Sequence, residues 1–440
     1  MNVTRHLFPR LLPAVATAAL VAVLPARAEE YTAWTITGWT DRPEARYQPG
    51  EPMKFYFRIL NANQPVPGKV RITLAADDGR RTETVHEVSA GKPLEITASL
   101  SRPGFVMARA TLLTPQGNAA RRPWRNQQLR DIQYGMGGCV EPEQLRPALP
   151  EPRDFDDFWT KVRRELADVP LKVKRVIRQQ DSNFTVYDLT IAAPGPRPAR
   201  GYLTIPRNAA PRSLPLDIQF DGYAVHAIRP RRLSNAIALI INAHGICNDG
   251  DENYYDTLAR GELRRYGFHN AENESPDKCY FKYMILRNLR AVEYGRTLPE
   301  WDGRRIQFSG GSQGAFQAVA VTALTPDATN CRISIPWLCD LGGITRGRIR
   351  GWRPDWRSGL GYYDTVHFGA RVKCPVQITA GLSDWTCPPS GVQVLYNQLR
   401  GRKELIFFQG LEHGAYFGYD QQKAARIVQK ASPGAAADFR

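Results

Sequence analysis

The stretch Ile306–Gln317 reads IQFSGGSQGAFQ. An apolar, β-prone run that includes Ile306 and Phe308 leads into a glycine-rich turn, and small residues follow Ser312. This order predicts a strand, a sharp turn and a helix, with Ser312 at the apex. The pattern G-x-S-x-G at such a junction is typical of a nucleophile elbow, because glycines avoid the clash that a Cβ would cause in a strained turn. We therefore interpret Ser312 as a nucleophile; the alternative is an ordinary turn serine.

A candidate acid and a candidate base follow Ser312 in the order that this kind of site requires. Asp384 lies in the loop after the predicted strand Val376–Ala380, and His413 lies in the loop after the next strand, Glu404–Phe408. Open α/β sheets place their sites at these carboxyl ends of strands. We predict that His413 takes the proton of Ser312 and that Asp384 orients the imidazole. A turn aspartate and a surface histidine are the alternatives.

Other acids and histidines compete for these roles. Asp340 follows an earlier predicted strand and is the rival acid, because some hydrolases place the acid one strand earlier. Glu412 is too close in sequence to His413 to face it easily. His226 and His244 are alternative bases, but both precede the serine in the chain, so we rank them below His413.

Two backbone N–H groups are needed to stabilise an oxyanion. One is expected from Gln313, the residue after the serine. The other is expected from the loop that follows the predicted strand Leu216–Phe220, where Gly222 lets the backbone turn toward the site. Tyr223 N–H is our candidate for this second donor.

Strand patterns alternate with helical patterns through the second part of the chain. Predicted strands are Thr185–Ala192, Gly201–Pro206, Leu216–Phe220, Ile237–Asn242, Arg305–Phe308, Cys331–Pro336, Val376–Ala380 and Glu404–Phe408. Predicted helices are Tyr254–Arg264, Lys278–Glu293, Ala315–Leu324 and Ser390–Leu399, and Asp154 is the expected cap of an earlier amphipathic helix. This order predicts the α/β class: an α/β-hydrolase fold over residues 139–440, with an antiparallel start and then a mostly parallel, doubly wound sheet covered on both faces.

Residues 29–138 have a different pattern. Short β-prone runs lie between turn signals, at Lys54–Leu60, Lys69–Ala75, Thr82–Val88, Leu94–Leu100 and Phe105–Leu113. Such runs without a helical period predict an all-β, immunoglobulin-like sandwich. The segment has no acid, base and nucleophile together, so we expect a binding or spacer module whose removal leaves catalysis nearly intact. Arg121–Pro152, rich in Arg, Gln, Gly and Pro, is interpreted as a linker.

The first 28 residues have the three parts of a secretory signal peptide. Basic residues precede the apolar run LLPAVATAALVAVLP, and the A-x-A site Ala26-Arg27-Ala28 follows. The apolar run is too short to span a bilayer, and no later stretch is long enough. We therefore expect a secreted or periplasmic protein without a membrane span in its mature form; the alternative is an uncleaved anchor.

Composition excludes some classes of partner. The 440 residues carry a net charge of +16 that is spread along the chain, and no nucleic-acid motif accompanies it, so nucleic-acid binding is not expected. The seven cysteines include no C-x-x-C pair and no zinc spacing, so no metal site is expected. Their odd number leaves at least one thiol free.

Four parts of the sequence resemble the acetyl xylan esterase / cephalosporin C deacetylase family of carbohydrate esterases. They are PRDFDDFW (Pro152–Trp159), QFDGYAV (Gln219–Val225), GGSQGA (Gly310–Ala315), and GLSDWTCPPS (Gly381–Ser390) with YNQLRGRKELIFFQGLEHG (Tyr396–Gly414). The resemblance runs from about Pro152 to Tyr419 and is specific, because the elbow, acid and histidine blocks agree in order and spacing.

The resemblance implies a catalytic triad of Ser312, Asp384 and His413 with Tyr223 and Gln313 as oxyanion donors. It also implies no metal, no cofactor and an acetylated carbohydrate as substrate. Two features depart from the family. An aspartate at 221 replaces the histidine that is usual before the Gly-Tyr pair, and the N-terminal sandwich is additional to the compact members. Their ring-like hexamer is therefore not carried over, and homo-oligomer formation stays open.

Our hypothesis is a secreted serine carboxylic-ester hydrolase that removes acetyl groups from polysaccharides or oligosaccharides such as acetylated xylan, through an acyl-enzyme on Ser312. The alternatives are a general carboxylesterase or peptidase of the same fold, or a non-catalytic carbohydrate-binding protein. A peptidase of the prolyl-oligopeptidase kind would usually carry a propeller, and the strands before Arg121 are too few for one. The complete set of candidate triad residues argues against a binding protein.

Overall fold

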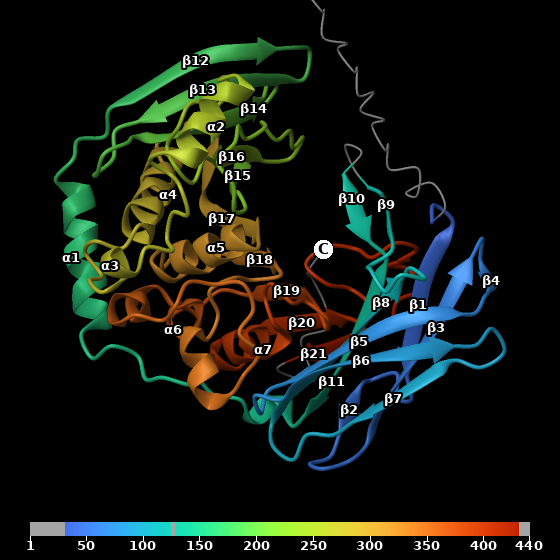
Figure 1. The fold of residues 1–440 in the computed structure, drawn as a ribbon. Helices are drawn as coiled ribbons and strands as arrows, with labels where there is room; N and C mark the ends of the chain where they lie inside the picture. The colour runs from blue at the N-terminus through green and yellow to red at the C-terminus, as the bar shows by residue number, and fades with distance from the viewer. Residues whose placement is uncertain (1–30, 125–127, 431–440) are drawn as a thin grey trace, which may run out of the picture.

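The computed structural model of the chain describes residues 31–124 and 128–430 (Figure 1). The predicted signal peptide, residues 1–28, lies outside the described residues. The N-terminal β-sheets, blue to teal in Figure 1, lie beside a larger α/β region, which is green to red. Within the described ranges, no helix has the length and apolar character needed to cross a bilayer.

A ten-stranded mixed sheet forms the centre of the α/β region. Its order is β12-β13-β14-β16-β15-β17-β18-β19-β20-β21. The strands are β12 (Val173–Gln180), β13 (Phe184–Ile191), β14 (Ala199–Pro206), β15 (Leu214–Phe220), β16 (Ile237–Ile241), β17 (Trp301–Gly311), β18 (Asn330–Ser334), β19 (Val376–Gly381), β20 (Lys403–Phe408) and β21 (Arg426–Lys430). The six strands from β16 to β20 in this order pair in parallel, and the remaining pairs are antiparallel. The eight predicted strands and the antiparallel start are confirmed, whereas β12 and β21 were not predicted.

Helices cover one face of the parallel strands. They are α1 (Phe155–Ala167), α2 (Glu252–Arg260), α3 (Asn270–Asn273), α4 (Phe281–Gly295), α5 (Gln313–Ala323), α6 (Thr365–Gly369) and α7 (Pro389–Gln398). Helices α4, α5 and α7 contact the strands from the side of Leu216, Phe308 and Ile378 (Figure 1). The opposite face carries Gln219 and Ser309, which are half-buried. The predicted cover on both faces is therefore wrong for these strands, because their alternation is that of a sheet with one apolar face.

Helix α1 begins where the sequence predicted, after Asp154, but its first turn is held differently. The Asp154 side chain makes no capping hydrogen bond. Its Oδ1 instead accepts a 2.5 Å bond from the Tyr362 hydroxyl. Phe155, Phe158 and Trp159 are buried, as the apolar spacing of three and four residues predicted.

The N-terminal strands form three sheets, and the two larger ones share one apolar cluster. The strands are β1 (Trp34–Thr40), β2 (Arg46–Tyr47), β3 (Met53–Asn61), β4 (Gln64–Pro65), β5 (Gly68–Ala76), β6 (Arg81–Val88), β7 (Leu94–Ala98), β8 (Gly104–Leu113), β9 (Arg121–Pro123), β10 (Leu129–Asp131) and β11 (Gln133–Val140). One of these joins β1, β3, β4 and β7, and the other has the order β2-β11-β8-β5-β6. Strands β9 and β10 pair in a third, two-stranded sheet. Ile36 and Phe57 of the first sheet and Ile72 and Val106 of the second lie in the same buried cluster. The immunoglobulin-like topology stays a prediction.

The predicted linker 121–152 contains three strands, so that interpretation is wrong for its first half. Strand β11 pairs with β8 along its whole length. Its glycines allow close approach to the α/β region: a Cβ on Gly135 would lie 2.3 Å from Ser383 Oγ, and one on Gly137 would lie 2.3 Å from the Leu382 carbonyl oxygen. The glycines that suggested a flexible connection are thus required by tight packing.

The two regions share a core. Phe105 of β8 meets Phe407 of β20 edge to face, with ring centroids 5.7 Å apart. Ala45 and Cys139 of the N-terminal sheets belong to the apolar cluster of the α/β region. Conversely, Phe417 belongs to the cluster between the N-terminal sheets. Part of the hydrophobic stabilisation of each region therefore depends on the other.

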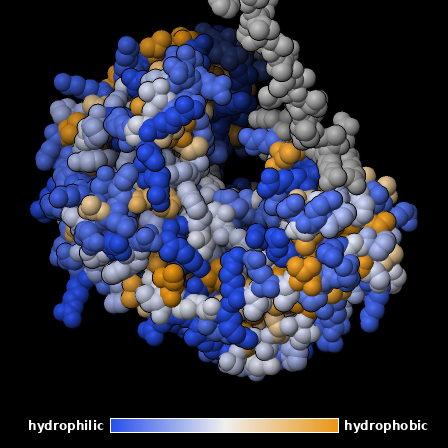
Figure 2. Space-filling model, viewed as in Figure 1, coloured by the Kyte–Doolittle hydropathy of each residue, from blue (hydrophilic) through white to orange (hydrophobic). Residues whose placement is uncertain are grey.

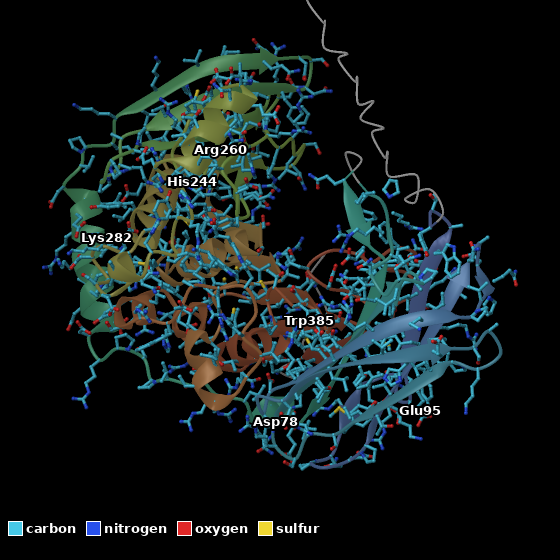
Figure 3. The ribbon with its side chains drawn as sticks, in the orientation of Figure 1. Asp78, Glu95, His244, Arg260, Lys282 and Trp385 are labelled. Carbon is cyan, nitrogen blue, oxygen red and sulfur yellow. The ribbon has the colours of Figure 1, made fainter. Side chains whose placement is uncertain are left out.

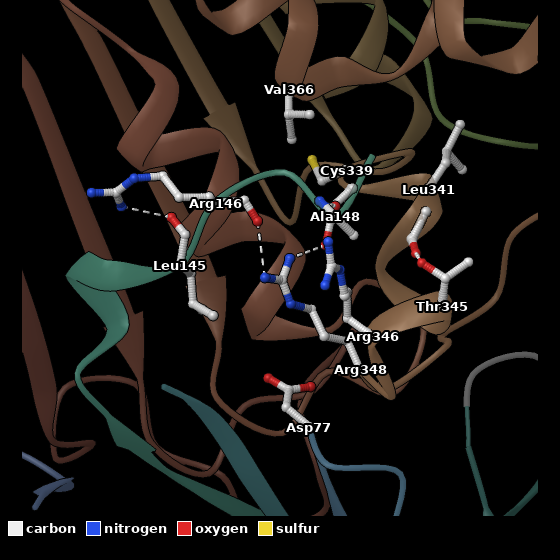
Figure 4. Close-up of polar contacts among 12 residues, drawn as sticks. Asp77, Leu145, Arg146, Ala148, Cys339, Leu341, Thr345, Arg346, Arg348 and Val366 are labelled. Atoms are coloured by element: carbon white, nitrogen blue, oxygen red, sulfur yellow. Dashed lines mark hydrogen bonds and ion pairs between the residues drawn. The ribbon is translucent and has the colours of Figure 1, made fainter. Parts of the chain in front are cut away.

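Polar contacts also cross this boundary near Asp77 and Arg348, which are labelled in Figure 4. Asp77 is buried, and its carboxylate accepts bonds from Phe105 N at 2.9 Å and from Ile349 N at 3.0 Å. Burial raises the pKa of Asp77 to about 6. Arg102 donates to the Arg346 carbonyl at 2.6 Å across the same boundary. Within the α/β region, Arg348 donates to the Arg146 carbonyl at 2.9 Å.

Candidate active site

Ser312 lies at the junction of β17 and α5, in a backbone conformation that non-glycine residues rarely adopt. Its φ is 55° and its ψ is −119°. Ser312 N–H donates to the Ser334 carbonyl at 2.9 Å, which holds this turn. Added Cβ atoms on Gly310 and Gly314 would each lie 2.3 Å from neighbouring backbone atoms. The glycines are therefore required, as expected for a strained strand–turn–helix junction.

His413 connects Ser312 to Asp384. Its Nε2 lies 3.0 Å from Ser312 Oγ, and its Nδ1 lies 3.0 Å from Asp384 Oδ2. The side chain of Asp384 is fully buried, while that of His413 is 30% exposed. The serine hydroxyl can thus give its proton to Nε2 while the carboxylate accepts a hydrogen bond from Nδ1–H. Ser312 and His413 are 101 residues apart in the sequence, and Asp384 and His413 are 29 apart. The parallel strands of the sheet bring the three residues together.

The loop after β19 orients Asp384. Its Oδ1 accepts 2.8 Å bonds from the N–H groups of Thr386 and Cys387, which leaves Oδ2 directed at the imidazole. Sequence reasoning did not assign a role to Cys387, whose thiol lies within 4.8 Å of ligand atoms of Asp384 and His413. Burial raises the pKa of this thiol well above its usual value, so it stays protonated and suits a metal ion poorly. All seven cysteines are free.

The rival acids have other partners. The Asp340 carboxylate accepts a bond from Ala148 N at 2.8 Å and forms an ion pair with Arg348. Glu412 forms an ion pair with Arg130. These contacts engage both carboxylates away from the imidazole of His413.

The other candidate histidines are engaged elsewhere. His244 is buried, its Nε2–H donates to the Ala224 carbonyl at 2.9 Å, and its Nδ1 accepts from the Tyr280 hydroxyl at 2.7 Å. Burial lowers the pKa of His244 to about 3, so it is neutral at ordinary pH. His226 lies 2.6 Å from Asp221, and this hydrogen bond raises the pKa of His226. The unusual aspartate at 221 is thus paired within its own loop.

The loop that carries Tyr223 lies against the start of α5. Gln317 of α5 donates a 2.9 Å bond to the Asp221 carbonyl, and Asn288 of α4 donates a 2.9 Å bond to the Gln317 side chain. The Tyr223 ring stacks on Tyr266, with centroids 4.3 Å apart. These contacts hold the loop beside the first turn of α5, where Gln313 begins the helix.

An aromatic group borders Ser312 on this side. Trp337 is buried, and its ring stacks on Trp352 with centroids 5.4 Å apart. Tyr223 meets Trp352 edge to face at 4.6 Å. A cavity of about 10 Å³ lies between residues of these loops, including Trp337, Trp352 and Cys387. No sign of a role for Trp352 was present in the sequence, because it lies in an irregular segment without a helical or strand pattern.

Trp385 points the other way, toward the N-terminal sheets (Figure 3). The guanidinium of Arg109 lies 4.6 Å from its ring centroid and that of Arg81 lies 5.5 Å away. Figure 2 shows a hollow between the N-terminal sheets and the α/β region, with mostly hydrophilic residues around it.

The strand order and the elbow define an α/β-hydrolase. Two solved structures share this fold. The acetyl xylan esterase from Paenibacillus sp. R4 matches with a TM-score of 0.51 and 22% identity, covering 62% of this chain and 94% of that chain. Acetyl xylan esterase 1 from Thermoanaerobacterium sp. JW/SL YS485 matches with a TM-score of 0.50 and 21% identity, covering 63% and 94%.

A profile of the acetyl xylan esterase (AXE1) family matches residues 141–346 and 356–431, and the chain belongs to this family. The chain is 28% identical over 290 residues to acetyl esterase Axe7A of Xylanibacter ruminicola. That alignment covers 62% of this chain and 66% of the relative, slightly less than two thirds of its length.

Proposed function

We propose that the protein is a serine esterase that removes acetyl groups from polysaccharides or oligosaccharides such as acetylated xylan, with Ser312, His413 and Asp384 as its catalytic triad. The observation that carries the proposal is the position of His413, 3.0 Å from both Ser312 Oγ and Asp384 Oδ2. A hydroxyl beside an imidazole whose other nitrogen is fixed by a buried carboxylate is the arrangement that activates a serine.

The reaction proceeds in two halves. Ser312 Oγ attacks the acetyl carbonyl while His413 Nε2 takes the hydroxyl proton, and collapse of the tetrahedral intermediate expels the sugar oxygen, which receives that proton. The acetyl group is then an ester of Ser312. Water attacks this ester with His413 as base, and acetate leaves as the serine recovers its proton.

The negative charge of each tetrahedral intermediate needs two donors. Gln313 N–H is at the first turn of α5, where the helix dipole also favours an anion. Tyr223 N–H is in the loop that Gln317 holds beside this turn. We assign both groups to the oxyanion hole, whose removal typically costs about 10²–10³ in kcat per donor.

The substrate assignment rests on the family and on the shape around the site. The relatives are described as acetyl or acetyl xylan esterases, and the hollow in Figure 2 offers room for a bulky alcohol. We further propose that residues 1–28 are a signal peptide, that the protein is exported, and that residues 29–138 form an immunoglobulin-like sandwich beside a catalytic domain over residues 139–440.

One assay series tests the proposal. Initial rates are measured on p-nitrophenyl acetate, acetylated xylan, acetylated monosaccharides and cephalosporin C, for the wild type and for Ser312→Ala. Release of acetate by the wild type alone is expected, since the variant lacks the nucleophile. Equal acetate release by Ser312→Ala would refute the acyl-enzyme mechanism, and activity on p-nitrophenyl acetate without any on sugars would refute the substrate assignment.

A further inference from the structure

We propose that the N-terminal strands β8, β10 and β11 support the proposed active site, and that Arg130 is a positioning residue that holds the loop of His413 in place. The inference rests on the proposed triad, because it assigns a role to contacts made with the two loops that carry His413 and Asp384. It concerns a segment, residues 129–137, that the match to the esterase family does not include.

Arg130 of β10 binds the loop that carries His413 (the histidine loop) on both sides of that residue. Its Nη2 pairs with the carboxylate of Glu412, the residue before His413, and its Nη1 donates a 2.9 Å bond to the Ala415 carbonyl. Gln133 of β11 donates a 3.3 Å bond to the other carboxylate oxygen of Glu412. A planar guanidinium that binds two points of one loop fixes its orientation, which a single contact would not.

The ion pair between Arg130 and Glu412 is partly shielded from solvent. The side chains of Arg130 and Glu412 are only 25% and 12% exposed. Burial raises the pKa of Glu412, whereas Arg130 and Arg109 act in the opposite direction. Loss of one partner of such a pair leaves a buried charge unpaired, which costs more than loss of an exposed ion pair.

The backbone of β11 supports both the histidine loop and the acid loop. Gln409 exchanges two hydrogen bonds with Gly137, at 2.8 and 2.9 Å. Ser383, the residue before Asp384, bonds to the Tyr416 hydroxyl at 2.6 Å, and Gly135 lies directly against both side chains. The acid loop and the histidine loop are thus fastened to each other and to one N-terminal strand.

Trp385, the residue after Asp384, completes this contact. Arg109 of β8 lies over its ring at 4.6 Å, within the distance of a cation–π interaction. N-terminal side chains therefore contact the immediate sequence neighbours of both His413 and Asp384. Since displacement of a catalytic group by about 1 Å can cost about 10²-fold in rate, these contacts bear on kcat rather than on folding alone.

The test uses the full-length chain with Arg130→Met, Arg130→Lys and Glu412→Gln, assayed on p-nitrophenyl acetate. We expect Arg130→Met to lower kcat at least about tenfold with KM within about threefold of the wild type. Arg130→Lys should recover part of the loss, because an ammonium still pairs with Glu412 but cannot hold two points. The control is Arg46→Met, which removes an exposed ion pair with Glu143 and should leave kcat unchanged.

Glu412→Gln keeps the test decisive if Arg130→Met fails to fold, because the amide retains the size of the carboxylate without its charge. It should lower kcat several-fold, again with little change in KM. If Arg130→Met or Glu412→Gln folds and has the kcat of the wild type, the inference is overturned. Ser312→Ala is assayed in parallel: an inactive Ser312→Ala beside a fully active Glu412→Gln refutes only the positioning role, whereas an active Ser312→Ala refutes the triad and the inference with it.

Discussion

The backbone N–H of Trp337 donates a 3.2 Å hydrogen bond to the carbonyl of Ser312. The turn after β18 therefore supports the elbow from the neighbouring strand, while Ser334 accepts from Ser312 N–H on the same side. That turn is itself strained, since Ile335 and Leu338 have φ values of 42° and 54°. Non-glycine residues at positive φ cluster at functional sites, where the surrounding structure holds them. Trp337 and the proposed nucleophile Ser312 are thus joined directly through a backbone hydrogen bond.

The acid of the triad can be identified by two substitutions. Asp384→Asn should lower kcat by on the order of 10³–10⁴, because the amide cannot stabilise the charged imidazole and favours the wrong tautomer. Asp340→Asn should retain most of the kcat of the folded protein, because Asp340 bonds to Ala148 and Arg348. Rates are measured on p-nitrophenyl acetate with the folded fraction checked by circular dichroism. If Asp340→Asn were inactive and Asp384→Asn active, Asp340 would be the acid of the proposed triad.

The sequence predicted the parts of the site that depend on local pattern. Short stretches of sequence were enough to predict the elbow, the strand before each loop and the order of Ser312, Asp384 and His413. The family match agrees with the function expected from them. Apolar and polar residues alternate in β15, LPLDIQF, which is the pattern of a sheet with one apolar face. The expectation of helices on both faces came instead from the order of strands and helices along the chain.

Contacts between distant segments could not be predicted. The glycines of β11 indicated a linker, since a single sequence does not tell a glycine needed for flexibility from one needed for close approach. The pairing of Arg130 with Glu412 joins positions 282 residues apart. The hydrophobic periodicity of a sequence does not reveal a contact between two distant polar residues. The N-terminal sheets were therefore expected to be a separable spacer.

Removal of the residues before Gly138 should abolish activity and soluble expression. The sequence alone suggested the opposite, but Phe105 packs on Phe407, and β11 packs on the loops of the proposed triad. Deletion would expose this apolar surface and remove the support of both loops. Expression yield, thermal melting and kcat on p-nitrophenyl acetate are compared with the full chain. A soluble truncated protein with kcat within a few-fold of the wild type would contradict the shared core.

His244 should make the fold sensitive to acid. Its pKa is about 3 in the folded protein against an ordinary value of 6.5, so the unfolded chain binds the proton more readily. Its contribution is complete above about pH 6.5 and is lost as pH falls toward 3. Between pH 7 and pH 4.5 this amounts to roughly 2–3 kcal/mol.

His244→Gln isolates this contribution, because an amide can still donate to Ala224 and accept from Tyr280. Urea unfolding at pH 7 and pH 4.5 gives the change in unfolding free energy for each protein. The variant should lose about 2–3 kcal/mol less than the wild type on acidification. Equal losses in the two proteins would show that His244 is not buried in its neutral form.

The final prediction concerns the length of the acyl chain. The cavity of about 10 Å³ beside Trp337, Trp352 and Cys387 has the volume that about one water molecule requires. If it receives the acyl group, a methyl fits and further methylenes meet the aromatic wall, which costs more than the roughly 1–3 kcal/mol of hydrophobic discrimination per methylene. We therefore expect kcat/KM to fall steeply from acetyl to butyryl to hexanoyl esters of one alcohol, while alcohols as different as a monosaccharide and a xylan chain are accepted.

Trp352→Ala tests the wall itself. Trp352 is 41% exposed, so its loss should leave the fold intact while it enlarges the cavity. The ratio of kcat/KM for butyryl over acetyl esters should rise by about tenfold or more, the equivalent of one lost methylene clash. Trp356→Ala is the matched control, because Trp356 is 39% exposed and does not line the cavity. Turnover of hexanoyl esters by the wild type equal to that of acetyl esters would point to a general carboxylesterase, and an unchanged ratio in Trp352→Ala would place the acyl group elsewhere.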